Sequence, residues 1–165
     1  MTRTLCHAVV VSLIAAAALT AQSPAGQDPS ADLLKQGQAK LREGKHDEAL
    51  ALVRQALAAS PDSYQANSQA GVVLDLMGQY GEARKYLTKA IEVAATDQDK
   101  TRALRSMAMS YAFESNCRDA TTYASRAYDI FLAAKDFFNS GEVANELARI
   151  CLESGDLDQA QKWYQ

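Results

Sequence analysis

Beyond residue 30, apolar side chains recur with the period of an α-helix. One group of apolar and small residues approximates helical spacing: Leu33, Leu34, Gly37 and Leu41. The next group follows the i, i+3, i+4, i+7, i+8 stripe of an amphipathic helix: Ala49, Leu52, Val53, Ala56 and Leu57. Continued along the chain, the pattern predicts an all-α protein with helices at about residues 31–43, 47–59, 63–77, 81–95, 99–114, 117–134, 138–153 and 156–165.

Small residues recur at matching positions in four segments, which indicates an internal repeat. The first segment has offsets 0, 7, 12, 19 and 24, occupied by Gly37, Gly44, Ala49, Ala56 and Pro61. The later segments contain Gly71, Gly78, Ala83 and Ala90, then Ala108, Ser115, Ala120 and Ala127, then Ala148, Gly155 and Ala160. The alanines at offset 12 are 34, 37 and 40 residues apart. Each unit is predicted to be a helical hairpin, with turn glycines in the left-handed conformation.

The phrases at the turns resemble the tetratricopeptide repeat family: GKHDEAL (44–50), GQYGEAR (78–84), SNCRDAT (115–121) and GDLDQAQ (155–161). The large aromatic residue near the start of each family unit is replaced by Leu33, Asn67, Leu104 and Ala144. The resemblance implies a right-handed α-solenoid of stacked antiparallel helical hairpins over residues 30–165. Its units are expected at about 30–63, 64–97, 101–134 and 141–165, the last one truncated.

The resemblance also implies a partner-binding groove on the concave face, which the first helix of each hairpin lines. The corresponding residues are Gln38, Arg42, Gln65, Ser68, Asp75, Arg102, Arg105, Met109, Asn145, Arg149 and Glu153. Arg102, Arg105 and Arg149 could bind an acidic segment or a chain terminus, because guanidinium groups form paired hydrogen bonds to carboxylates. A merely solvated face is the alternative. The family's carboxylate-clamp subclass is not predicted, because Leu34 and Gln38 occupy its lysine and asparagine positions.

The first thirty residues have a different character from the repeats. A basic start at Arg3 precedes an uncharged apolar run at residues 5–21, which is typical of a secretion signal. Residues 22–30, QSPAGQDPS, are predicted to be a linker. The sequence thus predicts a secreted or periplasmic protein; an uncleaved membrane anchor over residues 5–21 is the alternative.

The composition and charge exclude several other classes. Of 165 residues, 48% are hydrophobic and 22% charged, and 17 Lys and Arg against 20 Asp and Glu leave a net charge of −3. This mild acidity argues against a nucleic-acid-binding surface.

The two cysteines of the repeat region leave two interpretations open. Cys117 and Cys151 fall in adjacent units, so an exported chain could bridge them. The favoured interpretation is two small apolar packing residues, since free cysteine is often buried.

Residues suited to catalysis or metal binding are sparse. Beyond the signal, His46 is the single histidine and occupies a turn, so no histidine-based metal site or catalytic group is predicted, and no cofactor is expected. Aromatic side chains are predicted to pack in the core or between repeats: Tyr80, Tyr86, Tyr111, Tyr123, Tyr128, Trp163 and Tyr164.

Two functions follow from this reading of the sequence. The first is a non-enzymatic scaffold that binds a protein or peptide partner in an exported compartment. The alternative is the targeting or regulatory part of a larger exported or membrane-anchored enzyme, such as a peptidase or sensor kinase, that continues beyond Gln165. The sequence ends inside a predicted helix at Trp163 and Tyr164, so this uncapped end is also a candidate for self-association.

Overall fold

The computed structural model describes residues 29–165; the predicted secretion signal and nearly all of the predicted linker lie outside the described residues. Eight helices occupy this range: α1 (Pro29–Arg42), α2 (His46–Ala59), α3 (Tyr64–Leu76), α4 (Tyr80–Val93), α5 (Asp97–Ala112), α6 (Cys117–Ala133), α7 (Phe137–Glu153) and α8 (Leu157–Tyr164). Each begins and ends within two residues of its predicted range. The described residues contain no strand.

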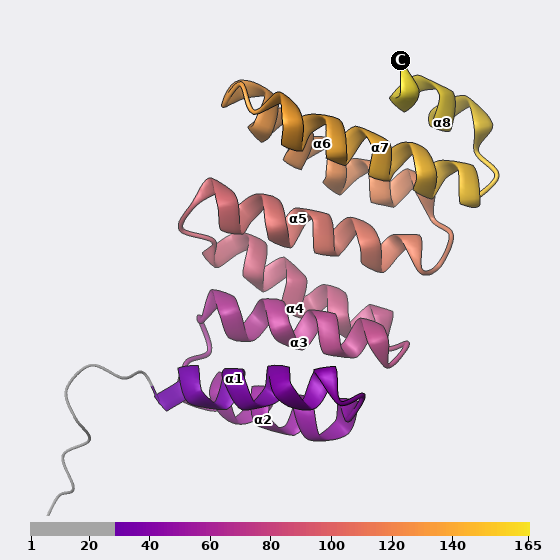
Figure 1. The fold of residues 1–165 in the computed structure, drawn as a ribbon. Coiled ribbons are helices and arrows are strands. Elements are labelled where there is room, and N and C mark those ends of the chain that lie inside the picture. Colours follow the sequence, from indigo (N-terminus) through magenta and orange to yellow (C-terminus); the bar gives the residue numbers. More distant parts are fainter. Residues whose placement is uncertain (1–28) are drawn as a thin grey trace, which may run out of the picture.

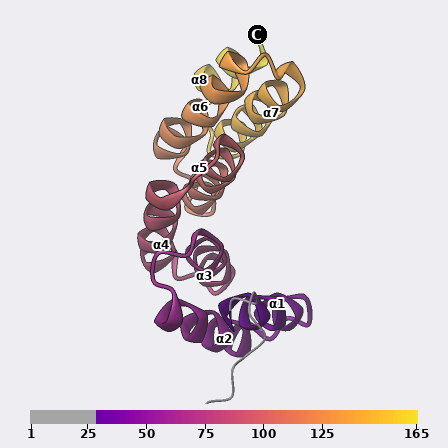
Figure 2. The same cartoon turned by 90° about the vertical axis from the view of Figure 1, so that its left-hand side faces the viewer.

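The helices are arranged as a stack of antiparallel hairpins (Figure 1). Each helix packs on the next one along the chain, and α3 also contacts α1 and α5. Viewed from the side, the stack is curved, with α1, α3, α5 and α7 on one side and α2 and α4 on the other (Figure 2). The expected all-α solenoid of stacked hairpins is thus confirmed.

The residues of the repeat pattern form the seams between helices. All nine alanines of the pattern are at most 3% exposed. A Cβ atom on Gly37 would lie 3.3 Å from Val53 Cγ2, and one on Gly71 would lie 2.5 Å from Leu87 Cγ. These glycines therefore let the two helices of a hairpin approach closely, because they carry no side chain.

The turns inside the hairpins depend on a left-handed residue after the first helix. Gly44, Gly78 and Gly155 have φ angles of 73°, 74° and 80°, which confirms their predicted conformation. The third hairpin has Ser115 at this place, with φ 55°. A side chain in this region brings Cβ close to the following carbonyl oxygen, so this turn is less favourable than the other three.

We expect Ser115→Gly to raise the free energy of unfolding by about 0.5–1 kcal/mol, because glycine adopts positive φ without the steric cost. Urea unfolding followed by circular dichroism measures the change. The matched control is Gly78→Ser, which has open space around its Cβ position and should be destabilising through backbone conformation alone. A stabilising Gly78→Ser, or an inert Ser115→Gly, would contradict this account.

The later helices begin with side-chain caps. The side chains of Asn116, Asp136 and Asp156 each accept a hydrogen bond of 3.1 Å from the backbone N–H three residues on. Hydrogen bonds from the side chain and backbone of Asn139 also hold the pKa of Asp136 below its usual value. These caps satisfy N–H groups that have no partner within the helix and thereby set the starts of α6, α7 and α8.

A disulfide joins Cys117 of α6 to Cys151 of α7, with a Cα–Cα distance of 4.8 Å. Both residues are buried and cluster with Ala160 of α8. The favoured interpretation of two free packing thiols is therefore wrong. The stacking brings the start of α6 beside the end of α7, close enough for a bridge.

The predicted packing of the aromatic residues is confirmed for six of the seven. Tyr111 stacks on Tyr123 with ring centroids 5.6 Å apart, and Tyr128 meets Trp163 edge-on at 5.5 Å. Tyr80 stacks on Phe113, and Tyr86 packs against the buried cluster around Leu74. Tyr164 was expected to pack but is 59% exposed; it is the last residue of α8, whose contacts with the core are made by Ala160 and Trp163.

Within residues 29–165, no helix combines the length and the apolar character needed to cross a membrane.

Candidate binding groove

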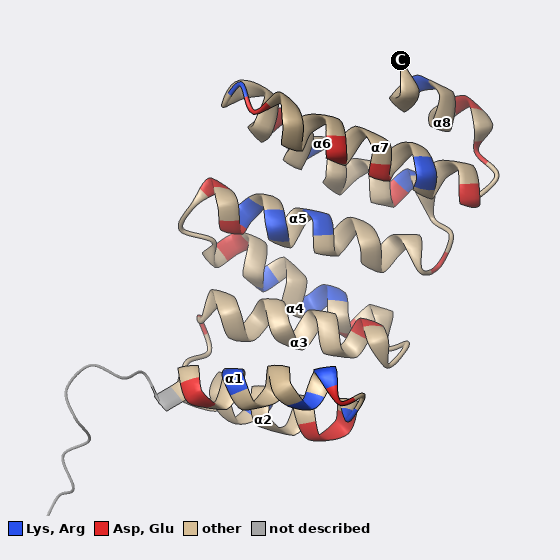
Figure 3. Cartoon of the chain, viewed as in Figure 1, with Lys and Arg blue, Asp and Glu red and all other residues tan. Residues whose placement is uncertain are grey.

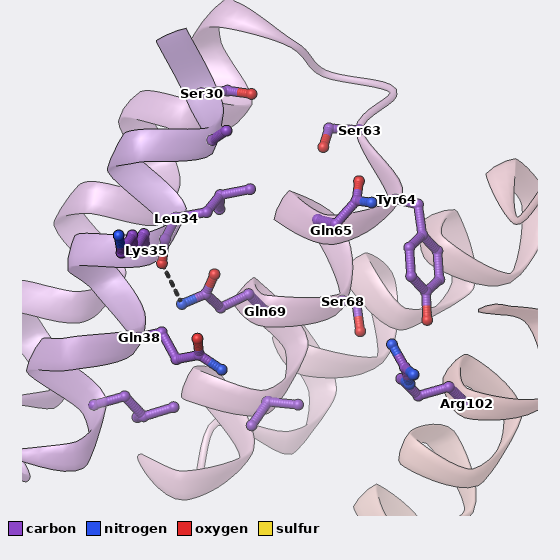
Figure 4. A pocket seen from close by; sticks show the side chains of 13 residues that line it. Ser30, Leu34, Lys35, Gln38, Ser63, Tyr64, Gln65, Ser68, Gln69 and Arg102 are labelled. Atoms are coloured by element: carbon purple, nitrogen blue, oxygen red, sulfur yellow. Dashed lines mark hydrogen bonds between the residues drawn. The ribbon is translucent and has the colours of Figure 1, made fainter. Parts of the chain in front are cut away.

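The concave side of the solenoid carries a hollow with polar and apolar lining between α1 and α3, closed at one end by α5 (Figure 4). We call it the Arg102 pocket; its volume is about 580 Å³. Polar side chains contribute much of its lining: Gln38, Gln65, Ser68, Gln69 and Arg102. The apolar part consists mainly of Leu34, Leu41 and Val72. The volume lies in the range of roughly 300–1,000 Å³ that ligand sites occupy.

Two contacts position the side chains of this pocket. Gln69 Nε2 donates a hydrogen bond of 3.2 Å to the backbone oxygen of Leu34, which ties α3 to α1. The Tyr64 hydroxyl donates to the backbone oxygen of Asp99 at 3.0 Å, which ties α3 to α5. Burial raises the pKa of Tyr64, so this hydroxyl keeps its proton as a donor. The walls of the pocket are therefore joined by direct contacts between the helices.

Two further hollows adjoin the first. The Arg105 pocket, of about 430 Å³, lies between α5 and α7 and is lined by Arg102, Arg105, Ser106 and Met109, among others. The Met109 pocket, of about 120 Å³, lies between α3 and α5 and is lined by Val72, Asp75, Leu76, Ser106, Met109 and Phe113. Because the three pockets share lining residues, they form one groove along α3 and α5.

The three arginines expected to bind a carboxylate differ in their surroundings. The Arg105 guanidinium is bound to Glu146 of α7, with Nη2 and Oε2 3.0 Å apart. Arg149 Nη1 lies 3.3 Å from Oε1 of Glu153 on the same helix. Arg102 is exposed and has no ion pair within residues 29–165. Arg102 is therefore the one arginine of the three whose charge is not already compensated by a carboxylate of the described chain.

The arrangement of charge along the groove supports this distinction. Helix α3 contains one charged residue, Asp75, whereas α5 carries several basic positions next to it (Figure 3). In the Arg102 pocket, the guanidinium of Arg102 points toward Ser68 and the Tyr64 hydroxyl (Figure 4). The other cation of the lining is Lys35, and the lining contains no Asp or Glu. The pocket is thus suited to a negatively charged group.

The structure brings most of the predicted groove residues together. Gln38, Gln65, Ser68 and Arg102 line the first pocket, and Arg105 and Met109 line the second. Asn145 and Arg149 line a further hollow with Tyr164, and this hollow shares Arg105 and Glu146 with the Arg105 pocket. Arg42 and Glu153 line none of these hollows.

Several contributors to this groove were not predicted from the sequence, among them Gln69, Val72 and Glu146. For Gln69 and Val72 a signal was present, since they lie four and seven residues after Gln65 on one helical face. Nothing in the local sequence marks Glu146, because its partner Arg105 lies 41 residues away.

Asp75 was expected to face a partner, but its side chain is mostly removed from solvent. The residue is 7% exposed, and its Oδ1 accepts a hydrogen bond of 2.7 Å from the buried hydroxyl of Ser110. Burial raises the pKa of Asp75, while the Ser110 hydrogen bond and the positive charge of Arg84 oppose this change. Asp75 therefore joins α3 to α5 beneath the groove.

A pH-dependent contribution to stability follows from this burial. A carboxyl whose pKa is higher in the folded than in the unfolded chain stabilises the fold fully below its unfolded pKa, and this contribution is lost as pH rises through the folded pKa. We expect the stability of the wild type relative to Asp75→Asn to fall as pH rises from acid to neutral. Urea unfolding of both proteins over a pH series measures the difference. A difference that is constant, or that grows with pH, would contradict the prediction.

The groove supplies groups that can bind a partner. In the range 29–165, no three His, Cys, Asp or Glu side chains come together as a metal ion would require. The groove instead presents amides, hydroxyls and one unpaired guanidinium. These groups donate and accept hydrogen bonds, so the arrangement is suited to holding a polar or acidic segment.

Comparison with known proteins places the chain among repeat solenoids. The family described as "Tetratricopeptide repeat" matches residues 40–108. BtubC (BKLC) from P. vanneervenii superposes with a TM-score of 0.73 at 16% sequence identity, over 87% of this chain and 64% of BtubC. "MamA RS-1 ArsTM double mutant" gives 0.65 at 17% identity, over 84% and 73%, and a crystal structure of MamA protein gives 0.64 at 18% identity, over 82% and 69%.

These similarities concern the fold. At such identities the superpositions establish a shared arrangement of helices and carry no residue roles. The chain spans less than two thirds of BtubC. No curated protein sequence matches it.

Proposed function

We propose that this chain, an all-α solenoid whose residues 40–108 match the tetratricopeptide repeat, is a non-enzymatic scaffold that binds a peptide or an extended protein segment along its concave face. The observation that carries the proposal is the unpaired Arg102 in the continuous groove formed by the three adjoining pockets. A guanidinium without an ion pair, next to amides and hydroxyls, supports recognition of a carboxylate together with the backbone of an extended chain.

We further propose that the protein works in an exported, oxidising compartment. Two independent features support this part of the proposal. Residues 1–21 have the pattern of a secretion signal, and the repeat region contains the Cys117–Cys151 disulfide. Disulfides persist mainly outside the reducing cytosol. The state of the cysteines in protein isolated from its own cells tests this part.

Affinity capture from the native compartment tests the groove. We expect Arg102→Glu to reduce recovery of the wild-type partners by about tenfold or more, because it replaces attraction of a carboxylate with repulsion. The matched control is Arg118→Glu on α6, another exposed arginine without an ion pair in the described part of the chain. This control should recover the same partners at wild-type yield.

Photo-crosslinking adds a readout that does not depend on charge. A photoreactive residue at Gln38, inside the Arg102 pocket, should form adducts with the captured partner. The same residue at Lys85, exposed on α4, should not. Equal capture by Arg102→Glu and the control, or adducts that form at Lys85 but not at Gln38, would show that the groove is not the binding face.

A further inference from the structure

The Met109 pocket differs in character from the rest of the groove. Its volume of about 120 Å³ is well below the roughly 300 Å³ at which small-molecule sites begin, and its lining is largely apolar. Leu76 and Phe113 line it and are 50% and 48% exposed. Asp75 also contributes, but its carboxyl is bound by Ser110. This hollow is therefore sized and lined for one apolar side chain.

The Met109 pocket is continuous with the site of free positive charge. It shares Val72 with the Arg102 pocket, and it shares Ser106 and Met109 with the Arg105 pocket, which Arg102 also lines. Arg102 and Met109 are two turns apart on α5, which separates their Cα atoms by about 10 Å. An extended chain advances about 3.3 Å per residue, so three residues span this distance.

We propose that the groove recognises an extended segment in which one acidic side chain pairs with Arg102 and one apolar side chain, about three residues away, enters the Met109 pocket. This inference rests on the proposed function and specifies the chemistry of its partner. Charge complementarity selects the acidic residue, because Arg102 has no ion pair among residues 29–165, whereas Arg105 is already bound to Glu146. The position of the Met109 pocket then determines how many residues separate the acidic from the apolar side chain of the segment.

Synthetic peptides test this inference directly. The probes are dye-labelled ten-residue peptides of glycine and serine that carry one glutamate and one leucine, one to six positions apart, in either order. Fluorescence anisotropy with the purified full chain measures each dissociation constant. We expect the tightest binding at a spacing of about three, in one of the two orders. Replacing the glutamate by glutamine should weaken binding about tenfold, and replacing the leucine by serine should weaken it several-fold.

Protein variants assign each preference to its pocket. Arg102→Gln should abolish the preference for glutamate over glutamine and retain the preference for leucine. Leu76→Ser, at a half-exposed rim position, should reduce the preference for leucine and retain that for glutamate. Arg118→Gln is the control and should change neither. Circular dichroism spectra and thermal unfolding confirm that each variant is folded.

The outcomes separate this inference from the proposed function. Binding that depends on charge but not on spacing, preferences that survive both variants, or no binding of any peptide would overturn the inference. If cellular partners still crosslink through Gln38 and are lost with Arg102→Glu, the proposed function stands without this motif. If the cellular partners do not crosslink at Gln38, the proposed function and this inference both fail.

Discussion

Reduction of the Cys117–Cys151 disulfide is expected to lower the free energy of unfolding by about 2–4 kcal/mol. The bridge closes a loop between residues 34 apart, and opening it returns conformational entropy to the unfolded chain. It also ties α6 to α7 where Ala160 of α8 packs. The C-terminal hairpin should therefore loosen first. Urea unfolding with and without reductant measures the loss, and hydrogen exchange should show faster opening in α7 and α8 than in α3 and α4.

The double variant Cys117→Ala/Cys151→Ala is the control for this experiment. It should match the reduced protein in stability and should not respond to reductant. Protein isolated from its own cells without reduction should have a mass two hydrogens below that of the reduced chain. Equal stability of the oxidised and reduced forms would contradict the stabilising role. A native mass without the deficit would contradict the proposed oxidising compartment.

Gly71→Ala is expected to lower the free energy of unfolding by about 1–2 kcal/mol, although alanine is the better helix former. A Cβ atom at this position would lie 2.5 Å from Cγ and 2.6 Å from Cδ2 of Leu87, far inside ordinary carbon contact. Leu87 is completely buried and cannot withdraw. The steric cost, about 1–3 kcal/mol, should exceed the helix-propensity gain of up to about 1 kcal/mol.

A double-mutant cycle with Leu87→Ala isolates this contact. Leu87→Ala alone should cost about 2–5 kcal/mol, but in that background Gly71→Ala should become neutral or stabilising. The matched control is Gly81→Ala on α4, where nothing lies within 4 Å of the new methyl group and a small gain is expected. An additive cycle would show that close helix crossing is not the reason for glycine at residue 71.

The local features of the fold could be predicted from the order of residues. Apolar periodicity located the eight helices of residues 29–165, and the spacing of small residues located the left-handed turns at Gly44, Gly78 and Gly155. These features depend on backbone geometry and on neighbours within one or two turns, so a single sequence contains the needed information. The exception, Ser115, has the same conformation without glycine.

For the groove, only the face of the solenoid that holds it could be predicted from the sequence. The first helix of each hairpin was expected to line it, and most of the expected side chains do line its pockets. Which of these side chains can still bind a ligand depends on their contacts with residues of other hairpins. Arg105 binds Glu146, which lies 41 residues further along the chain, and Asp75 binds Ser110, which lies 35 residues further along. Residue types alone do not identify such pairs, because each arginine and each aspartate looks equally available in the sequence.

The residue pattern alone therefore established a repeat of helical hairpins and its turns, because both follow from short-range geometry. Which helices line the inner face was implied only by the family resemblance. Packing of the hairpins decided the rest: that Arg102 keeps a free charge, that Asp75 is buried, and that Cys117 meets Cys151. The reason is distance along the chain. Stacking brings together side chains 34 or more residues apart, and their mutual contacts determine which groups remain for a partner.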